Sequence, residues 1–380
     1  MINVAVILKR KYTALEHYRQ VTPHEHLSKL FPEDFNIQYY ESDGGVVDQI
    51  PDEELKKYQL IQFIRQIDPR GDEYTKKTIN RLHSLGLKVV FDIDDYWKLD
   101  RDHAGYDNFV KAGYTETATS GIKNSDWVTT TTAHFADEIK PYNSNITVLP
   151  NCISPLDKQW TISPIENARI RFGWVGGVFH LPDVELLRPA IQRINKSFNG
   201  VSQDEYQLCL AGFNPSAEYI NMERVLTCGH SSIKRMDSEY YSYLVEMTPA
   251  MEHISYDKPY RRIWTKSVQT YGQVYNEIDV ALVPLRDTLF NNCKSELKII
   301  EAGTMGKAVI ASCVTPYQQH IADGNNGMLA TNWYDEIKYM IREPEHRKDM
   351  AAQLSEDIKK TFNSERIQTE RAQLYKRLVQ

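Results

Sequence analysis

A short segment near residue 300 combines residue types that can bind phosphate and sugar hydroxyls. The stretch NNCKSELKIIEAGTMG, from Asn291 to Gly306, carries Lys294 and Lys298 four positions apart, so both ammonium groups can reach one diphosphate. Glu301 follows within the predicted helix, and its carboxylate can accept paired hydrogen bonds from vicinal sugar hydroxyls. On an isolated helix such lysines would be solvated surface residues. Beside Glu301 we favour phosphate binding.

The middle of this segment has the pattern of a helix start. A buried strand ends at Pro284, a polar loop follows, and Ser295 can cap a helix with Glu296 and Lys298 in its first turn. The unpaired backbone N–H groups and the dipole of a helix N-terminus attract an anionic group. We therefore expect four residues around this start to contact a bound nucleotide, namely Asn291, Ser295, Glu296 and Leu297.

The acidic run DIDD, Asp92 to Asp95, ends a predicted strand in the first half of the chain. Carboxylate oxygens are the ligands that Mg²⁺ and Mn²⁺ prefer, so a metal site is one interpretation. The run is far along the chain from the predicted phosphate-binding helix. We favour contact with a second substrate, or capping of the following segment by Asp95, and expect no metal. Arg65, directly after the strand LIQFI, is a further candidate for contact with that substrate or a phosphate.

Composition and charge exclude several classes of protein. The formal net charge is −6 with basic residues spread along the chain, so a nucleic-acid partner is not expected. Five cysteines without a CxxC pair argue against a disulfide framework or a thiolate zinc site. The first apolar run is too short for a signal peptide or a membrane span. We expect a cytoplasmic protein, with peripheral contact at the inner membrane face left open.

The alternation of strand-like and helix-like stretches predicts the elements that position these residues. In the first half, the β-branched runs NVAVIL, LIQFI, KVVFDI, WVTTTT and ITVLP alternate with helical patterns such as the stretch from Asp72 to Gly86. A second series of predicted strands follows Pro150, namely RIRFGWVGG, YQLCLAGF, a strand near Glu252 to Tyr256, DVALVPL and AVIASCV. Such alternation predicts βαβ units and parallel sheets.

Prolines at 150, 155 and 164 suit a link between two domains. We therefore expect an α/β chain of two Rossmann-like, doubly wound domains, 1–155 and 156–361, facing a central cleft at the carboxyl ends of their strands. A charged helix at about 362–380 is expected to pack back on the first domain.

Several stretches between Lys88 and about Leu329 resemble the GT-B glycosyltransferases, and among them the large retaining group 1 family. FGWVGGVFHLPDVELL resembles the first strand and glycine turn of the family's donor domain, where Gly176 and Gly177 let the backbone approach a ligand. The helix SELKIIEAGTMG, followed by PYQQHIADGNNGMLA, is similar to the family's donor-binding helix region. SDWVTTTTAHFADEIKPYNSNITVLPNCIS resembles the end of its acceptor domain.

The resemblance implies roles for individual residues. Glu301 matches the second of two family glutamates, which contacts the nucleotide ribose; the first, which contacts the donor sugar, would fall at Cys293 and is absent. An arginine that often follows LCLAGF is also missing, and Arg286, Arg261 or Arg262 are candidates to replace its charge. A histidine often contacts the donor sugar, which points to His103 or His180. Lys294, Lys298, Glu301 and His103 are thus the expected catalytic residues.

The activity that the resemblance implies is transfer of a sugar from a UDP-sugar or GDP-sugar to an acceptor hydroxyl, with retention and without a metal. A glycan, a lipid-linked molecule or a protein are all open as acceptors. The missing glutamate and arginine leave two alternatives, a nucleotide-sugar 2-epimerase of the same fold and a binding module without activity.

Overall fold

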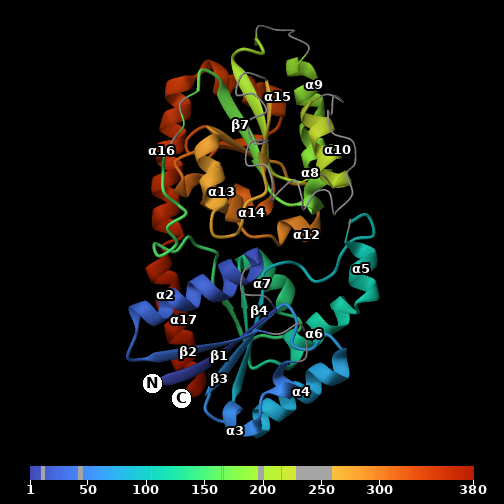
Figure 1. Cartoon of the computed structure of the whole chain (residues 1–380), viewed down its shortest axis with the longest axis vertical. Coiled ribbons are helices and arrows are strands. Elements are labelled where there is room, and N and C mark those ends of the chain that lie inside the picture. The colour runs from blue at the N-terminus through green and yellow to red at the C-terminus, as the bar shows by residue number, and fades with distance from the viewer. Residues whose placement is uncertain are drawn as a thin grey trace, which may run out of the picture. The chain divides into compact units, whose positions relative to one another are not determined.

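The chain forms two compact units, each built on its own sheet (Figure 1). The computed structural model describes residues 1–9, 13–41, 46–103, 105–163, 165, 167–195, 201–214, 216–227 and 259–380. The first unit comprises Met1–Asp157, Thr288–Leu297 and Phe362–Gln380, and the second comprises Lys158–Asp287 and Lys298–Thr361.

The first unit contains a six-stranded parallel sheet in the order β2-β1-β3-β4-β5-β6. Its strands are β1 (Ile2–Leu8), β2 (Phe35–Glu41), β3 (Leu60–Ile64), β4 (Lys88–Ile93), β5 (Trp127–Thr130) and β6 (Ile146–Val148). Its helices are α1 (Ala14–Glu16), the π-helix η1 (His17–Val21), α2 (Thr22–Leu30), η2 (Val46–Gln49), α3 (Asp52–Leu55), α4 (Asp72–Ser84), α5 (Tyr106–Lys111), α6 (Tyr114–Asn124), α7 (Ala133–Ile139), α12 (Leu289–Asn292) and α17 (Ser364–Val379).

Each face of this sheet is covered by its own apolar core. The alternation along β3 sends Ile61 and Phe63 into the core that helices α4, α6 and α7 complete. Leu60 points to the opposite face, where α2 and α17 supply the core. Strands buried on both faces read as continuous apolar runs, which is why the sequence reveals them.

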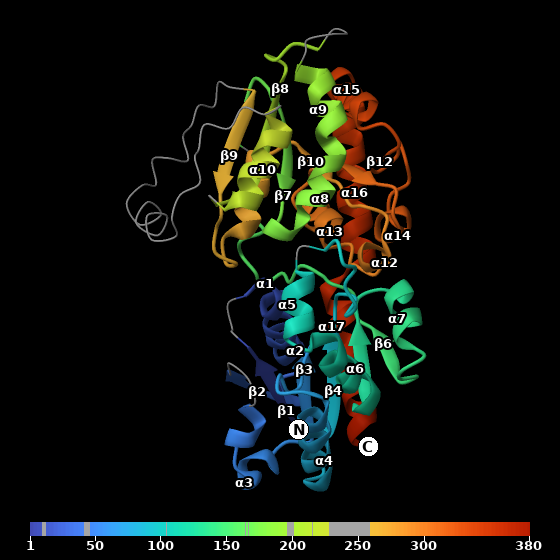
Figure 2. The same ribbon diagram turned by 90° about the vertical axis from the view of Figure 1, so that its right-hand side faces the viewer.

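The second unit repeats the layout with the strand order β12-β11-β10-β7-β8-β9, again all parallel (Figure 2). Its strands are β7 (Ile170–Val175), β8 (Tyr206–Phe213), β9 (Tyr260–Trp264), β10 (Val280–Val283), β11 (Ala308–Ser312) and β12 (Met328–Ala330). Its helices are η3 (Val178–His180), α8 (Leu181–Val184), η4 (Glu185–Leu187), α9 (Arg188–Asn195), α10 (Ala217–Leu226), η6 (Tyr271–Glu277), α13 (Leu297–Thr304), α14 (Thr315–Gln318), α15 (Trp333–Arg342) and α16 (Pro344–Thr361).

The predicted α/β class with two parallel sheets is confirmed. Strands β2, β9 and β12 were not predicted from the sequence, and the strand predicted near Glu252 to Tyr256 lies outside the described residues. The predicted second domain includes Thr288–Leu297, whereas the structure groups this segment with the first unit. The reason is that Cys293 is fully buried in the first unit's core.

No helix in the described ranges has both the length and the apolar character that crossing a membrane requires.

A buried histidine joins α2 to the carboxyl-terminal helix α17. The Nδ1 atom of His24 lies 2.6 Å from the carbonyl oxygen of Gln20, and its Nε2 atom lies 2.8 Å from the hydroxyl of Tyr375. Burial, reinforced by the positive charge of Arg371, lowers the pKa of His24 from 6.5 to about 3. The folded protein therefore holds this imidazole neutral at pH values where an unfolded chain protonates it.

This histidine predicts a loss of stability in mild acid. Because the folded pKa lies below the unfolded one, the stability that neutral His24 supplies is present above about pH 6.5 and declines as the pH falls toward 3, by at most about 1.4 kcal/mol per pH unit. Urea unfolding at several pH values should show a shallower acid dependence for His24→Asn than for the wild type. The partly exposed His83, replaced by Asn, is the control, and an unchanged slope for His24→Asn would contradict the assignment.

Candidate functional site

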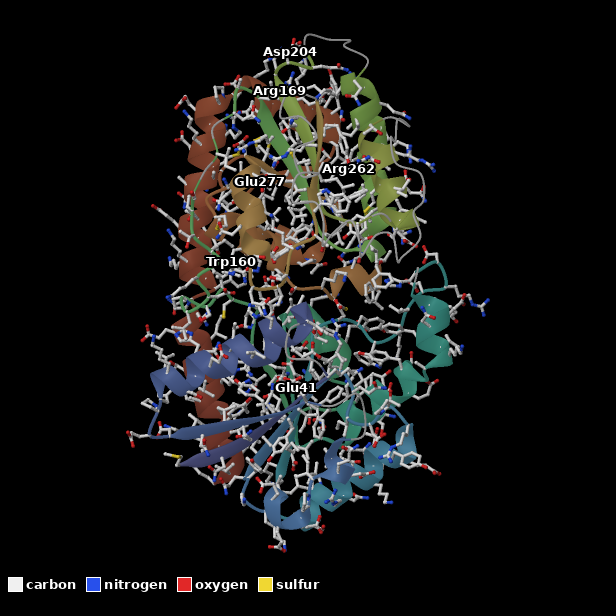
Figure 3. All side chains as sticks on the ribbon, in the orientation of Figure 1. Glu41, Trp160, Arg169, Asp204, Arg262 and Glu277 are labelled. Carbon is white, nitrogen blue, oxygen red and sulfur yellow. The ribbon has the colours of Figure 1, made fainter. Side chains whose placement is uncertain are left out.

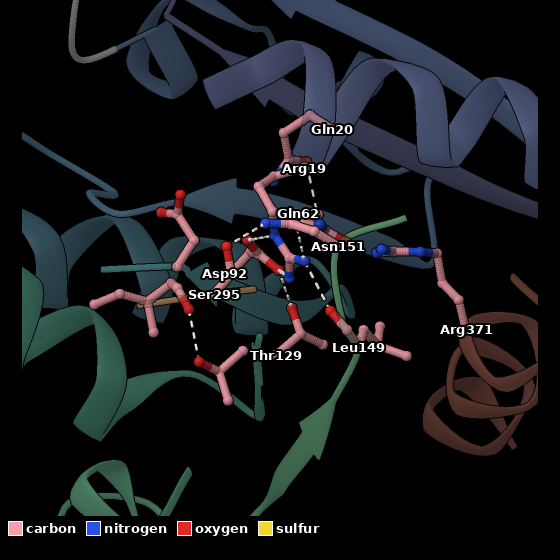
Figure 4. Close-up of polar contacts among 12 residues, drawn as sticks. Arg19, Gln20, Gln62, Asp92, Thr129, Leu149, Asn151, Ser295 and Arg371 are labelled. Atoms are coloured by element: carbon pink, nitrogen blue, oxygen red, sulfur yellow. Dashed lines mark hydrogen bonds and ion pairs between the residues drawn. The ribbon is translucent and has the colours of Figure 1, made fainter. Parts of the chain in front are cut away.

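A buried ion pair joins Arg19 to Asp92 in the first unit (Figure 4). Arg19, carried by the π-helix η1, donates from Nε to Asp92 Oδ1 at 3.0 Å and from Nη2 to Oδ2 at 2.6 Å. Both side chains are almost completely buried. The Thr129 hydroxyl donates to the same carboxylate at 2.6 Å, and Arg19 Nη1 donates to the Leu149 carbonyl at 2.7 Å. Asp92, the first residue of the acidic run, therefore connects η1 to β4 and β5 through these hydrogen bonds.

The same network extends to the segment that sequence analysis singled out. Asn151 accepts a hydrogen bond from Arg19 Nη1 at 3.2 Å and donates to the Ser295 hydroxyl at 2.8 Å. Helix α13 begins at Leu297, so the expected start at Ser295 is two residues too early. The physical reason is that the short helix α12 takes up the preceding residues and the Ser295 hydroxyl is engaged with Asn151. Glu296, expected in the first turn, directly precedes α13 and is buried.

A second charged group gathers where β3 and β4 end in the first unit. Arg65 donates to both carboxylate oxygens of Asp94, at 2.5 and 2.9 Å, and also ion-pairs with Asp95. Lys294 Nζ lies 3.2 Å from Asp95 Oδ1 and 4.5 Å from the centre of the Phe290 ring. Arg65 has a φ of 57°, a conformation that is rare without glycine and costs about 1–2 kcal/mol. Asp94 and Asp95, the last two aspartates of the acidic run, thus bind the side chains of Arg65 and Lys294.

Within the described ranges, no three His, Cys, Asp or Glu side chains gather in an arrangement that can hold a metal ion. Of the expected site residues, His103 lies beside α12 and Asn291 belongs to it. The His103 ring lies 5.0 Å from the Phe290 ring, and its Nδ1 accepts a hydrogen bond from the Gly105 backbone at 3.0 Å. Asn291 lies in α12 and is buried.

In the second unit, Glu301 is held by three donors. The hydroxyls of Tyr271 and Tyr275 donate to Glu301 Oε2 at 3.1 and 2.7 Å, and Lys298 Nζ donates to the same oxygen at 2.9 Å. Burial, followed by the charge of Glu301, raises the pKa of Tyr271, so this hydroxyl keeps the proton that it donates. Glu301 is fully buried, and its Oε1 has no hydrogen-bond donor among the described residues.

The glycine turn after β7 combines one crowded position with one open position. A Cβ atom on Gly176 would meet the Trp174 ring at 2.6 Å, so packing alone explains this glycine. A Cβ on Gly177 would meet no atom of the described residues within 4 Å, and its φ of −102° suits any residue. The backbone at Gly177 therefore faces open space.

Asp183 connects two of the expected site residues in the second unit. The His180 Nδ1 lies 2.8 Å from Asp183 Oδ2, and the backbone N–H of Arg286 donates to Asp183 Oδ1 at 2.8 Å. The two other candidate arginines are engaged elsewhere. Arg261 ion-pairs with Glu277 and Arg262 with buried Glu223; Arg262 and Glu277 both lie within the body of this unit (Figure 3).

Sequence reasoning missed four residues of these clusters, namely Arg19, Asp183, Tyr271 and Tyr275. The HLPD spacing of His180 and Asp183 is a signal that could have found the second of them. Arg19 and the two tyrosines carry no such local signal, because their partners are 73, 30 and 26 positions away.

Comparison with known proteins finds a family match within the second half of the chain. Residues 169–343 match the sequence model of the family described as "Glycosyl transferases group 1". This segment is a group 1 glycosyltransferase domain. It contains Gly176, Gly177, Arg286 and Glu301, along with both tyrosines that hold Glu301. No curated protein matched the sequence.

Solved structures of glycosyltransferases share the fold of the whole chain. HepE of Anabaena in complex with UDP superposes with a TM-score of 0.60 at 10% identity, over 98% of this chain and 99% of that one. A glycosyltransferase from Rickettsia africae gives 0.63 at 11% identity, over 100% and 99%. A UDP-forming α,α-trehalose-phosphate synthase from Burkholderia vietnamiensis gives 0.59 at 8%, over 99% and 98%. The expected GT-B fold is confirmed.

The glycine turn of the glycosyltransferase domain yields a paired prediction for folding. Gly176→Ala should destabilise the protein by about 1–3 kcal/mol, because the new methyl group overpacks against Trp174. Gly177→Ala should unfold at the wild-type temperature, because its methyl group meets no atom in the part of the chain that the structure describes. Thermal unfolding followed by circular dichroism compares the two, and equal losses would contradict this account of the turn.

Proposed function

We propose that this chain transfers a sugar from a nucleoside diphosphate donor to an acceptor hydroxyl. The observation that carries the proposal is the group 1 glycosyltransferase domain at residues 169–343, in which Glu301 is held with one carboxylate oxygen lacking a donor. A buried acceptor atom without a partner costs about 1–3 kcal/mol, and more when charged. A donor hydroxyl that bonds Oε1 would remove that cost, which supports Glu301 as a ligand of the nucleotide ribose.

Lysines 298 and 294 are proposed to contact the diphosphate. Lys298 is partly exposed and already neutralised by Glu301, so a phosphate can share its ammonium group without a large desolvation cost. Lys294 is held by Asp95 in the first unit, so its proposed contact requires the ammonium to exchange Asp95 for the donor. The expected contacts of Gly176, Gly177, His180, Arg286, Asn291, Ser295, Glu296 and Leu297 with the donor are part of the same proposal.

The chemistry follows from the charge that develops on the leaving group. As the glycosidic bond stretches, the diphosphate gains negative charge, which the lysines stabilise electrostatically. We propose retention, with a diphosphate oxygen helping to take the acceptor proton, so no protein nucleophile is needed. Cys293 does not fit such a role, because burial raises the pKa of its thiol to about 12. We propose that His103 contacts the donor sugar.

A UDP-sugar is the donor to test first, since HepE is solved with UDP and with UDP-glucose, and a GDP-sugar is the alternative. We propose that the reaction needs no metal, because the carboxylates of the acidic run are engaged by Arg19 and Arg65. The first unit is proposed to bind the acceptor, with Arg65 as a contact. A glycan, a lipid-linked molecule and a protein remain the candidate acceptors.

The donor site is tested by removing charge at Glu301 and Lys298. Glu301→Gln and Lys298→Ala should each lower kcat/KM about 30- to 100-fold or more, because each removes a charged hydrogen bond worth about 2–3 kcal/mol. Tyr275→Phe should cost less, about fivefold, since Tyr271 and Lys298 still hold Glu301. Turnover is measured with UDP- and GDP-sugars over a panel of acceptors.

The matched control for this series is Lys359→Ala, an exposed lysine of α16, which should behave as the wild type. Wild-type turnover in both Glu301→Gln and Lys298→Ala, with folding intact, would refute the proposed site. Donor binding without transfer to any acceptor would favour a binding module. An epimerised sugar formed without acceptor would favour the epimerase.

Gly177 offers a second test that separates ligand contact from folding. Gly177→Ala should weaken donor binding at least tenfold in calorimetry, because the added methyl group occupies the open space proposed for the donor. Its predicted wild-type stability ensures that a loss of affinity reports the ligand. An unchanged Kd would show that the donor does not approach this backbone.

A further inference from the structure

Three charged residues form a row at the amino-terminal edge of the second unit's sheet. Arg171 precedes Phe172, Asp279 precedes Val280 and Lys307 precedes Ala308, and these following residues are paired in register across β7, β10 and β11. Residues that share a row on adjacent parallel strands are about 5 Å apart and point to the same face. Asp279 thus lies between two cations, one on either side.

Asp279 is engaged with only one of its two neighbours. Arg171 Nε and Nη2 donate to the two oxygens of Asp279 at 2.9 and 2.8 Å, and the Arg171 backbone N–H donates at 2.8 Å. Lys307 is 6% exposed, and neither an ion pair nor a side-chain hydrogen bond joins its ammonium group to any described residue. Nη1 of Arg171 is also buried without an acceptor in the described part of the chain. Arg171 Nη1 therefore has an unused donor in the interior, and the Lys307 ammonium group lies in the same row with no partner among the described residues.

The surrounding charges leave this place positive. Arg347, in the first turn of α16, is close enough to interact with Asp279, and Arg261 is paired with Glu277 nearby. The cations of this region are Arg171, Arg261, Lys307 and Arg347, against the three carboxylates of Asp279, Glu277 and Glu345. Burial lowers the pKa of Lys307, which shows that removal from water is not offset by Asp279.

This edge is separate from the proposed donor site in the same unit. Gly176 and Gly177 follow the carboxyl end of β7, whereas Arg171 lies at its beginning. A strand of this length spans about 20 Å at roughly 3.3 Å per residue. A ligand at the amino-terminal edge therefore does not share contacts with one at the glycine turn.

We propose that Lys307, Arg171 and Arg347 bind a small oxyanion of the phosphate class at this edge of the sheet. Several acceptor oxygens on a compact, doubly charged ion match the unused donors of one ammonium and one guanidinium group. The ion neutralises the excess of positive charge and supplies the acceptors that Lys307 lacks. This site is independent of the proposed sugar transfer and of its donor.

The test is binding of inorganic phosphate to the full chain, by calorimetry and by thermal unfolding at constant ionic strength. Low millimolar phosphate should raise the Tm of the wild type and of Lys359→Gln, a surface control on α16, since a ligand stabilises the state that binds it. Lys307→Gln should lose this rise. Lys298→Gln, which alters the donor site, should keep it.

Two further readouts protect the test against a folding defect. Without phosphate, Lys307→Gln should melt no lower than the wild type, because it removes a positive charge beside Arg171 that no ion pair with a described residue compensates. Arg347→Gln, at a half-buried position, should weaken phosphate binding if Lys307→Gln does not fold. The proposal is overturned if the wild type shows neither heat nor shift with phosphate. It is equally overturned if Lys307→Gln retains the shift or if Lys298→Gln abolishes it.

Discussion

The ion pair between Arg19 and Asp92 is the constraint on which the first unit's polar interior depends. Both side chains are almost completely buried, so removing either would leave an uncompensated charge at a cost of about 3–5 kcal/mol. The geometry offsets the desolvation of the pair, because Thr129, Leu149 and Asn151 supply the remaining hydrogen bonds. The Arg19 guanidinium group thereby joins the π-helix η1 to β4 and to the residues that follow β6, and Asp92 extends the network to Thr129 of β5.

The network reaches the segment that precedes α13 through the hydrogen bond from Asn151 to the Ser295 hydroxyl. Buried Cys293, the ion pair of Lys294 with Asp95, and the packing of His103 on Phe290 attach the same segment to the first unit. Lys298 and Glu301 follow directly along the chain in α13. Cys293 occupies a core position, where an ionised carboxylate would be costly.

The sequence allowed most of the fold to be predicted because the strands are parallel and buried. Runs such as LIQFI and KVVFDI are continuous and apolar, which is typical of strands covered on both faces. Strand β2, FNIQYYE, lies at the edge of its sheet and is half exposed, so it lacks that signal. The start of α13 was misplaced at Ser295 because a serine before an apolar run is a common cap, and only the contact with Asn151 shows another use of its hydroxyl.

By itself the sequence determined the class of the fold and the family resemblance, because buried parallel strands and local motifs are each carried by one continuous stretch of chain. Only the tertiary structure decided which groups bind the Glu301 carboxylate and which bind the carboxylates of the acidic run. Tyr271 and Tyr275 meet Glu301, and Arg19 meets Asp92, across loops and strands, and local spacing carries no record of such contacts. These contacts form where separate elements pack together, because a buried charge needs hydrogen-bond partners and the fold supplies them from residues that are distant in the sequence.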